Sequence, residues 1–267
     1  MMFVLRRVKQ YELVLHGITL KDKIKLLILA VFYTLPNKIT NMNAKTPQLM
    51  IDVSKNTRVK SEGVIYKLSH PRQLFMISDQ FERNIQYWFN LSGETFLDIG
   101  ANIGKYSIKL SDRFKNVHAF EPTPETFSML KHNVEENKIK NIHLHQIAAW
   151  NTDTDLTFHL KNNPGGNSAS MEENSVGTLT VVAEKLDNYI DTFGKVDLVK
   201  IDVEGAELEV LEGMSRIINE CSPIIIVEVL EKNRFSLYRF MDQHDYGLIK
   251  TQNRNHLFYP TCIDLGA

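Results

Sequence analysis

Cysteine is scarce in this chain of 267 residues, which contains Cys221 and Cys262 alone. The two stand far apart, without the CxxC or histidine spacing of a zinc site and without the dense pattern of a disulfide-stabilised secreted domain. Neither sign of charge is in large excess, since 31 basic and 32 acidic residues give a formal net charge of −1. Binding that depends on neutralising many phosphates is not expected from this balance, so nucleic acid is disfavoured as a partner. The composition predicts a globular protein of a reducing, cytoplasmic compartment.

A dinucleotide-binding fingerprint is also missing, although a related glycine-rich turn is present. A short apolar run at residues 95–99 predicts a buried parallel strand, and it leads into the sequence LDIGANIGKYS. In the GxGxxG fingerprint the second glycine lets the backbone approach a pyrophosphate, whereas Asn102 stands at that position here. A nicotinamide-dependent oxidoreductase is therefore the least favoured alternative. The turn instead has the pattern DxGxNxG, formed by Asp98, Gly100, Asn102 and Gly104.

A second strand is predicted at residues 117–120, and it ends at Glu121 in the sequence HAFEP. In doubly wound sheets an acid at the end of the second strand accepts hydrogen bonds from two ribose hydroxyls. The turn and Glu121 together predict a cofactor that contains adenosine. The DxGxNxG pattern resembles motif I of class I S-adenosylmethionine-dependent methyltransferases, whose ligand carries a sulfonium and an amino-acid tail. The resemblance implies S-adenosyl-L-methionine as the cofactor.

Predicted strands and helices alternate from about residue 76, which indicates an α/β fold with a mostly parallel sheet. Helices are expected at residues 79–89, from Pro124 onwards with Thr123 as the cap, after Gly205, and at 234–242. Further strands are expected at residues 142–149, at 223–230, and as a pair through 248–259.

The strand at residues 142–149 is expected to form an edge of the sheet, with His143 and His145 as solvated side chains and not as metal ligands. Residues 156–160 and 178–183 are predicted to pair as antiparallel strands around the polar loop 162–177. A loop of this length inside a compact domain is functional or disordered, and a substrate-side flap is the favoured interpretation.

Charged residues interrupt an apolar strand in the sequence VDLVKIDVEGAELEVLEGM, at residues 196–214. Lys200, Asp202 and Glu204 alternate with apolar residues and are expected to share one face of the strand. Glu228, near the end of the next strand, brings another carboxylate to the same crevice, where an acceptor is expected to dock. Asp202, Glu204 and Glu228 are candidate bases, with Lys200 as their charge partner. A buried ion network that only shapes the loop remains the alternative, and a divalent cation is disfavoured.

These motifs in order, together with QIAAW, LDNYI and PIIIVEV, resemble the FkbM family of S-adenosylmethionine-dependent methyltransferases over about residues 76–231. The resemblance implies a Rossmann-like class I methyltransferase fold, with a seven-stranded, mostly parallel sheet and helices on both faces. It implies methylation of a hydroxyl on a sugar, a glycan or glycoconjugate, or a secondary metabolite. A catalytically idle cofactor-binding or assembly subunit is the alternative. The implied cofactor-binding residues are Asp98, Gly100, Ala101, Asn102, Gly104, Tyr106, Glu121, Pro122, Ala148 and Ala149, the last two beside the adenine.

The chain divides by pattern into an N-terminal extension at residues 1–75 and a methyltransferase domain at 76–267. Residues 1–40 carry seven Lys and Arg against two acids, and the apolar run at 24–35 is too short to span a bilayer. One interpretation is a segment that holds the enzyme at a membrane surface. The other is a helix that packs on the domain or on a second copy in a homodimer. A strand pair at residues 57–60 and 64–68, turning at Gly63, completes the extension.

Overall fold

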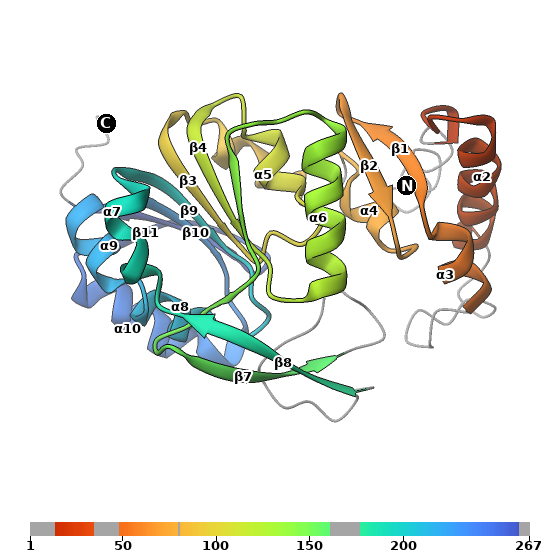
Figure 1. Ribbon diagram of the computed structural model, residues 1–267. Helices are drawn as coiled ribbons and strands as arrows, with labels where there is room; N and C mark the ends of the chain where they lie inside the picture. The colour runs from red at the N-terminus through yellow and green to blue at the C-terminus, as the bar shows by residue number, and fades with distance from the viewer. Residues whose placement is uncertain (1–13, 35–47, 80, 161–176, 262–267) are drawn as a thin grey trace.

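The computed structural model describes residues 14–34, 48–79, 81–160 and 177–261 (Figure 1). Its helices are α2 (Leu20–Thr34), α3 (Gln48–Ser54), α4 (Gln73–Met76), α5 (Lys105–Lys109), α6 (Pro124–Glu136), α7 (Ile190–Phe193), α8 (Glu207–Glu212), α9 (Ser215–Cys221) and α10 (Arg234–Gln243). Its strands are β1 (Thr57–Ser61), β2 (Val64–Leu68), β3 (Gly93–Ile99), β4 (Phe114–Phe120), β5 (Ile142–His145), β6 (Ala148–Ala149), β7 (Thr154–Leu160), β8 (Gly177–Glu184), β9 (Val196–Ile201), β10 (Ile224–Glu228), β11 (Tyr246–Gln252) and β12 (Asn255–Pro260). Short 3-10 helices are η1 (Gln86–Phe89), η3 (Leu186–Tyr189) and η4 (Glu231–Asn233).

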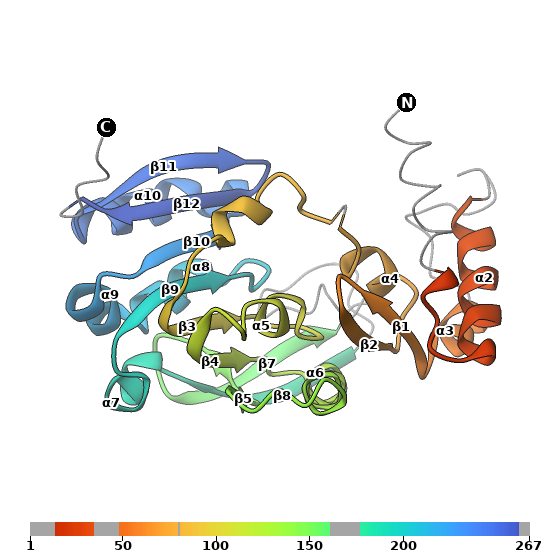
Figure 2. The same cartoon turned by 90° about the horizontal axis from the view of Figure 1, so that it is seen from above.

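A seven-stranded sheet in the order β11-β12-β10-β9-β3-β4-β5 forms the centre of the molecule (Figure 2). Its strands from β10 to β5 pair in parallel, and β12 pairs antiparallel with both β10 and β11. The chain order changes direction between β3 and its two neighbours, β4 and β9. In open α/β sheets such a switch point is where ligands bind, outside the carboxyl ends of the strands. The expected seven-stranded, mostly parallel sheet is confirmed.

Alternate residues of the buried strands pack into two different cores. Phe96, Leu198 and Ile226 belong to a cluster with side chains of α5 and α6. Their neighbours Leu97 and Val199 belong to a second cluster with side chains of α7, α8, α9 and α10. The period of two along each strand therefore sends apolar side chains to helices on both faces of the sheet.

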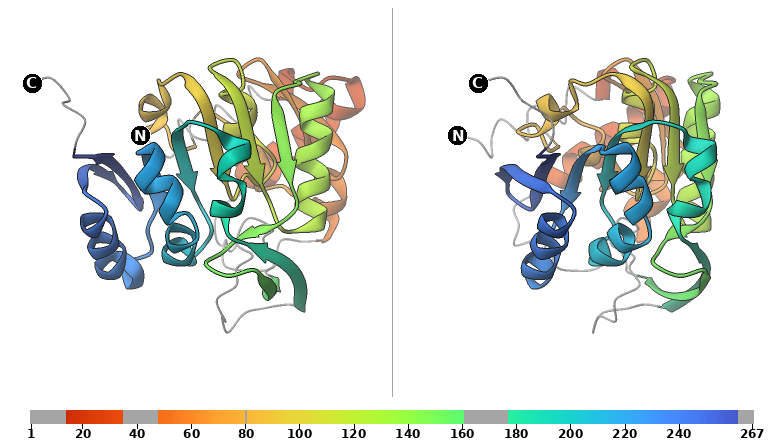
Figure 3. Two further views of the ribbon diagram at one scale, coloured as in Figure 1. Left: turned by 60° about the vertical axis from the view of Figure 1, so that its left-hand side comes forward. Right: turned by 90° about the vertical axis from the view of Figure 1, so that its left-hand side faces the viewer.

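The edge strand is shorter than the sequence predicts. β5 stops at His145, and Ala148 and Ala149 pair with Ala183 and Glu184 of β8 in a separate three-stranded sheet. β7 and β8 pair antiparallel as expected and project from one end of the central sheet (Figure 3). The predicted flap loop between them lies outside the described residues.

Two local predictions are wrong. Residues 81–85 form turns in place of the expected helix, because Glu82 adopts a left-handed φ of 51° that interrupts helical geometry. Thr123 stands at the N-cap position of α6 but its side chain makes no capping bond, although Pro124 opens the helix as predicted. The amide of Thr123 instead donates to Oε1 of Glu121 at 2.9 Å.

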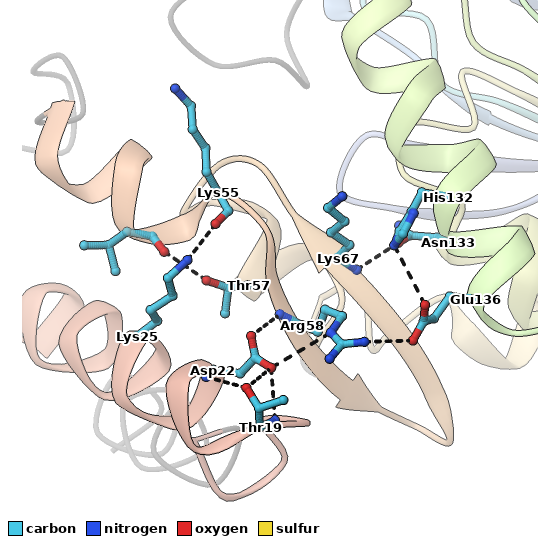
Figure 4. Close-up of polar contacts among 11 residues, drawn as sticks. Thr19, Asp22, Lys25, Lys55, Thr57, Arg58, Lys67, His132, Asn133 and Glu136 are labelled. Atoms are coloured by element: carbon cyan, nitrogen blue, oxygen red, sulfur yellow. Dashed lines mark hydrogen bonds and ion pairs between the residues drawn. The ribbon is translucent and has the colours of Figure 1, made fainter.

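The first described elements fold against the rest of the chain. β1 and β2 form the predicted hairpin, and α2 packs on α3 and β1 at the end of the molecule opposite α9 and α10 (Figures 1 and 2). Arg58 of β1 donates to Glu136 of α6 at 3.3 Å, which ties the hairpin to the central domain (Figure 4). Among the described residues, no helix is long and apolar enough to cross a membrane.

Candidate functional site

The turn after β3 is built by glycine where the ends of two strands touch. Gly100 has a φ of 82°, and a Cβ placed on it would lie 1.9 Å from the carbonyl oxygen of Asp202. The amide of Asp202 donates to the carbonyl of Ile99 at 2.9 Å, so the ends of β3 and β9 are directly joined. Any side chain at Gly100 would push them apart. Asn102 is also left-handed, and its side-chain oxygen accepts from the amide of Ile103 at 2.9 Å.

Asp98 fastens this turn to helix α5. Its Oδ2 accepts from the amide of Ser107 at 2.9 Å and from the Ser107 hydroxyl at 2.5 Å. Its Oδ1 is buried and has no hydrogen-bond partner among the residues that the structure describes. Burial raises the pKa of Asp98, although Lys200 and Ser107 oppose this effect. An enclosed acceptor without a donor is costly, which makes this oxygen a candidate ligand contact.

Glu121 lies at the carboxyl end of β4, beside the same turn. The carbonyl of Phe120 accepts from the amides of Gly100 and Ala101 at 3.0 and 2.9 Å, which brings the turn against this strand end. Burial raises the pKa of Glu121 to about 7. Hydrogen bonds from the backbone amides of Thr123 and Asn102 stabilise the ionised carboxylate and partly oppose this rise. A bound ligand that donated hydrogen bonds to this carboxylate would favour its ionised form.

The remaining residues predicted to contact the cofactor differ in how deeply they are buried. Ala148 and Ala149 are buried, and Pro122 is half-buried next to Glu121. Tyr106 is buried with its ring stacked on Phe89 at 4.4 Å between ring centroids.

Glu82 is a site residue that the sequence did not indicate. The Tyr106 hydroxyl donates to its Oε2 at 2.5 Å, and Asn255 of β12 donates to its Oε1 at 3.1 Å. The carboxylate of Glu82 therefore links the segment before β3 to β12, which is separated from β3 in the sheet by β10 and β9. The apolar spacing around Glu82 predicts a helix, whereas its backbone is left-handed, so the local sequence pattern does not indicate that its carboxylate reaches this site.

Lys200, Asp202 and Glu228 form a charge cluster at the ends of β9 and β10, in which Lys200 is buried and the two acids are half-buried. Lys200 Nζ donates to Oδ2 of Asp202 at 2.9 Å and lies 4.9 Å from the centre of the Tyr106 ring. Burial disfavours the ionised form of Asp202, but Lys200 and a hydrogen bond from Glu228 outweigh it and lower the pKa of Asp202. Burial and the negative charge of Asp202 raise the pKa of Glu228 to about 9. The opposite directions of the two shifts favour the ionised form of Asp202 and the protonated form of Glu228.

Glu204 does not extend the alternating pattern of the strand. β9 ends at Ile201, and Glu204 has a left-handed φ of 54° in the loop that follows. Its charge still raises the pKa of Glu228, so it lies within electrostatic reach of the cluster. Glu207 holds this loop, because it accepts from the Gly205 amide at 2.6 Å and from Asn233 Nδ2 at 2.7 Å.

The histidines of the sheet edge differ in exposure. His143 is exposed, whereas His145 is half-buried, stacks on Phe120 and lies 3.0 Å from His118 between ring nitrogens. The expectation of two solvated side chains is therefore wrong for His145, which packs between aromatic neighbours. In the described ranges, no group of three or more His, Cys, Asp or Glu side chains could hold a metal ion.

Comparison with known proteins identifies the family. The model of the Methyltransferase FkbM domain matches residues 98–248, which is more than half of the chain. Hexuronic acid methyltransferase AglP of Haloferax volcanii is 31% identical over 134 residues, covering 49% of this chain and 54% of the relative. Methyltransferase 1 of Beauveria bassiana is 26% identical over 142 residues, covering 44% of this chain and 57% of the relative. The chain thus spans little more than half the length of either protein.

A solved structure supports the assignment of the fold. The FkbM methyltransferase from Methylobacillus flagellatus superposes with a TM-score of 0.51 at 17% identity, covering 96% of this chain and 59% of that chain. The family match includes the glycine turn, Glu121 and the Lys200, Asp202 and Glu228 cluster. This chain belongs to the FkbM methyltransferase family.

Proposed function

We propose that this protein is an S-adenosyl-L-methionine-dependent O-methyltransferase that acts on a hydroxyl group of a sugar or glycoconjugate. The observation that carries the proposal is the position of Asp202, which pairs with Lys200 at 2.9 Å and whose backbone carbonyl touches the Gly100 turn. The glycine turn proposed to bind the cofactor and the proposed proton acceptor, Asp202, lie side by side because β3 and β9 are adjacent strands of the sheet.

The residues around the turn fit S-adenosylmethionine. Glu121 is a buried carboxylate at the strand end, suited to accept from ribose hydroxyls. No residue in the described part of the chain donates to Oδ1 of Asp98, and the amino group of the ligand's tail would be a suitable donor. Ala148 and Ala149 are the proposed adenine contacts, because small side chains would let a flat ring approach the backbone at this strand end. When bound, this cofactor supplies an electrophilic methyl group on a sulfonium.

Asp202 is the proposed acceptor of the hydroxyl proton. The ion pair with Lys200 at 2.9 Å favours its ionised form, whereas the raised pKa of Glu228 favours the protonated acid. As the hydroxyl oxygen bonds to the methyl group it gains a third substituent and positive charge, so its proton becomes strongly acidic and a carboxylate of low pKa suffices to accept it. Before the transfer, Lys200 neutralises the charge of Asp202 and orients its carboxylate. Glu204 is proposed to tune Glu228 from the adjacent loop.

A sugar is the proposed acceptor class. The relative from Haloferax volcanii carries the name of a hexuronic acid methyltransferase, and it is the most specific chemical name among the relatives compared above. Secondary metabolites remain the second class to be screened, because the same base could serve any alcohol held beside Asp202.

Paired amide variants test the assignment of the base. Asp202→Asn should lower kcat with a glycan or uronic-acid acceptor by about 100-fold or more, since it removes the ionised proton acceptor. Glu228→Gln should lower kcat by less than about fivefold at neutral pH, because glutamine resembles the protonated acid already present. Transfer of labelled methyl groups from the cofactor to product measures both.

Calorimetry with S-adenosylhomocysteine provides the control for folding and cofactor binding. Both variants should retain affinity within about threefold, since neither carboxylate is assigned to the cofactor. Tight cofactor binding without methyl transfer to any sugar or metabolite acceptor would support an idle cofactor-binding subunit instead. Equal losses in the two variants would point to a structural ion network in place of a base.

A further inference from the structure

Helix α2 presents an apolar stripe on its outward face. Leu20, Ile24, Leu27 and Ile28 have exposed fractions of 75%, 53%, 47% and 42%. Their spacing of four, three and one residues places them on one side of a helix. A group of large apolar side chains on one exposed face indicates a site of interaction with another protein or with a membrane.

The opposite face of α2 is firmly attached to the protein, which fixes the direction of the stripe. Leu26, Leu29 and Ala30 are fully buried. Asp22 accepts from the amide and hydroxyl of Thr19 at 3.0 and 2.7 Å and from the amide of Arg58 at 3.0 Å (Figure 4). The helix is thus capped and joined to β1, and its apolar outer side chains are held away from the core.

Lysines border the stripe on both sides. Lys21 and Lys23 are exposed, and the 3.6-residue period places them on opposite flanks of the line through Leu20, Ile24 and Leu27. Asp22, the acid of α2, points to the buried face and pairs with Arg58. The outward surface of this helix therefore combines apolar side chains with positive charge and carries no acid of its own.

We infer that the α2 surface, made of Leu20, Ile24, Leu27 and Ile28 with Lys21 and Lys23, docks on a membrane that contains anionic lipids. Apolar side chains would enter the boundary of headgroups and acyl chains, and the flanking ammonium groups would remain with the phosphates. A helix of 15 residues is about 22 Å long, shorter than the roughly 30 Å of a bilayer core, so it lies in the interface plane.

The charge pattern favours lipid over a second copy of the chain. A symmetric pairing through α2 would place Lys21 and Lys23 of both copies around one small contact, where like charges repel. The stripe of one short helix also provides far less than the roughly 1,200 Å² that stable protein interfaces bury. An anionic lipid surface meets the apolar stripe and both lysines at once.

Flotation with vesicles tests the inference on the full chain. Wild-type protein should float with phosphatidylcholine vesicles containing about one third phosphatidylglycerol, and at least tenfold less with pure phosphatidylcholine. Leu27→Glu should reduce the bound fraction at least tenfold, because it places a charge in the apolar stripe. Lys21→Glu/Lys23→Glu should do the same and remove the dependence on anionic lipid.

Matched variants separate a specific surface from general charge effects. Phe235→Glu changes an 80% exposed apolar residue on α10, and Lys131→Glu/Lys140→Glu changes two exposed lysines elsewhere. Both should float like wild type, and all variants should retain the wild-type circular dichroism and Tm. Failure of the wild type to float, equal losses in the controls, or a dimer in solution that Leu27→Glu converts to monomer would each overturn the inference.

Discussion

The carboxyl group of Glu121, the proposed ribose contact, illustrates how a single buried acid affects stability. Its pKa of about 7 in the folded chain lies well above the usual value for glutamate, because burial penalises its charged form. The folded protein therefore holds this proton more tightly than the unfolded chain does. Stability from this group is fully present below the unfolded pKa and is lost as the pH rises through about 7.

Glu121→Gln should make the free protein more stable at about pH 8 and change it little at about pH 5. The gain at the higher pH is of the order of 3 kcal/mol at most, set by the difference between the two pKa values. Urea unfolding at both pH values measures it. The same variant should bind S-adenosylhomocysteine at least tenfold more weakly.

A variant that gained no stability at the higher pH would contradict the raised pKa. Unchanged cofactor affinity would independently remove Glu121 from the ribose contact. Thr123 offers a control, since Thr123→Ser preserves the amide that donates to Glu121 and should leave both properties close to wild type.

At the residue scale, the sequence predicts positions where a residue stands at the end of a buried strand. Asp98, Gly100 and Glu121 lie together as expected because sheet geometry places the ends of neighbouring strands side by side, and their contacts with a cofactor stay predictions. Glu82 and Asn255 were not found, because their contact joins segments far apart in the chain. No periodicity in either segment encodes that contact.

At the scale of the elements, the turn between β3 and α5 can be compared with the turn of the β1–β2 hairpin, because each contains a left-handed glycine. Gly100→Ala should cost about 3 kcal/mol or more and abolish cofactor binding, because its Cβ would collide with the backbone carbonyl of Asp202. Gly63→Ala is the matched control in the β1–β2 hairpin. Gly63 has a similar φ of 89° but open space around a new Cβ, so its cost should be only the conformational strain of about 1 to 2 kcal/mol.

Chemical denaturation of the two alanine variants compares these costs, and calorimetry measures cofactor binding. Equal destabilisation would mean that the left-handed backbone alone matters at Gly100. In that case the close approach of β3 and β9 would not be the reason that glycine is needed at residue 100.

Strands were easier to predict than their ends. The apolar runs of β3, β4, β9 and β10 identify buried parallel strands, and the pair β11 and β12 also lies in the predicted region. The alternation from Lys200 to Glu204 suggested a longer strand, but Glu204 adopts a left-handed conformation that ends the pattern. The run at 142–149 likewise reads as one strand, although Ala148 and Ala149 pair in another sheet. Pairing partners decide such boundaries, and they lie outside the local sequence.

On the scale of the whole molecule, one buried cluster joins the N-terminal elements to the central sheet. Leu29 of α2 and Val59 of β1 belong to the same cluster of buried apolar side chains as Phe96 of β3. The division at residue 75 remains a prediction, but this continuity indicates cooperative unfolding across it.

Leu29→Ala should therefore destabilise the entire protein by about 2 to 5 kcal/mol in a single transition. Leu27→Ala, at a 47% exposed position on the same helix, should change stability by less than about 0.5 kcal/mol. Circular dichroism and intrinsic fluorescence should report coincident transitions in both variants. Two separate transitions in the wild type would instead show that the extension unfolds independently.

The central position of β3 also has a consequence for how the site assembles. β3 pairs on one side with β4, which follows it closely in the chain, and on the other with β9, about 100 residues later. Glu121 can therefore reach its place early in folding, through contacts of short sequence separation. Asp202 reaches the turn at Gly100 only once β9 has paired with β3. Enzymatic activity is thus expected to appear late in refolding, after most of the local structure has formed, and to report the completion of the longest-range pairing at the heart of the sheet.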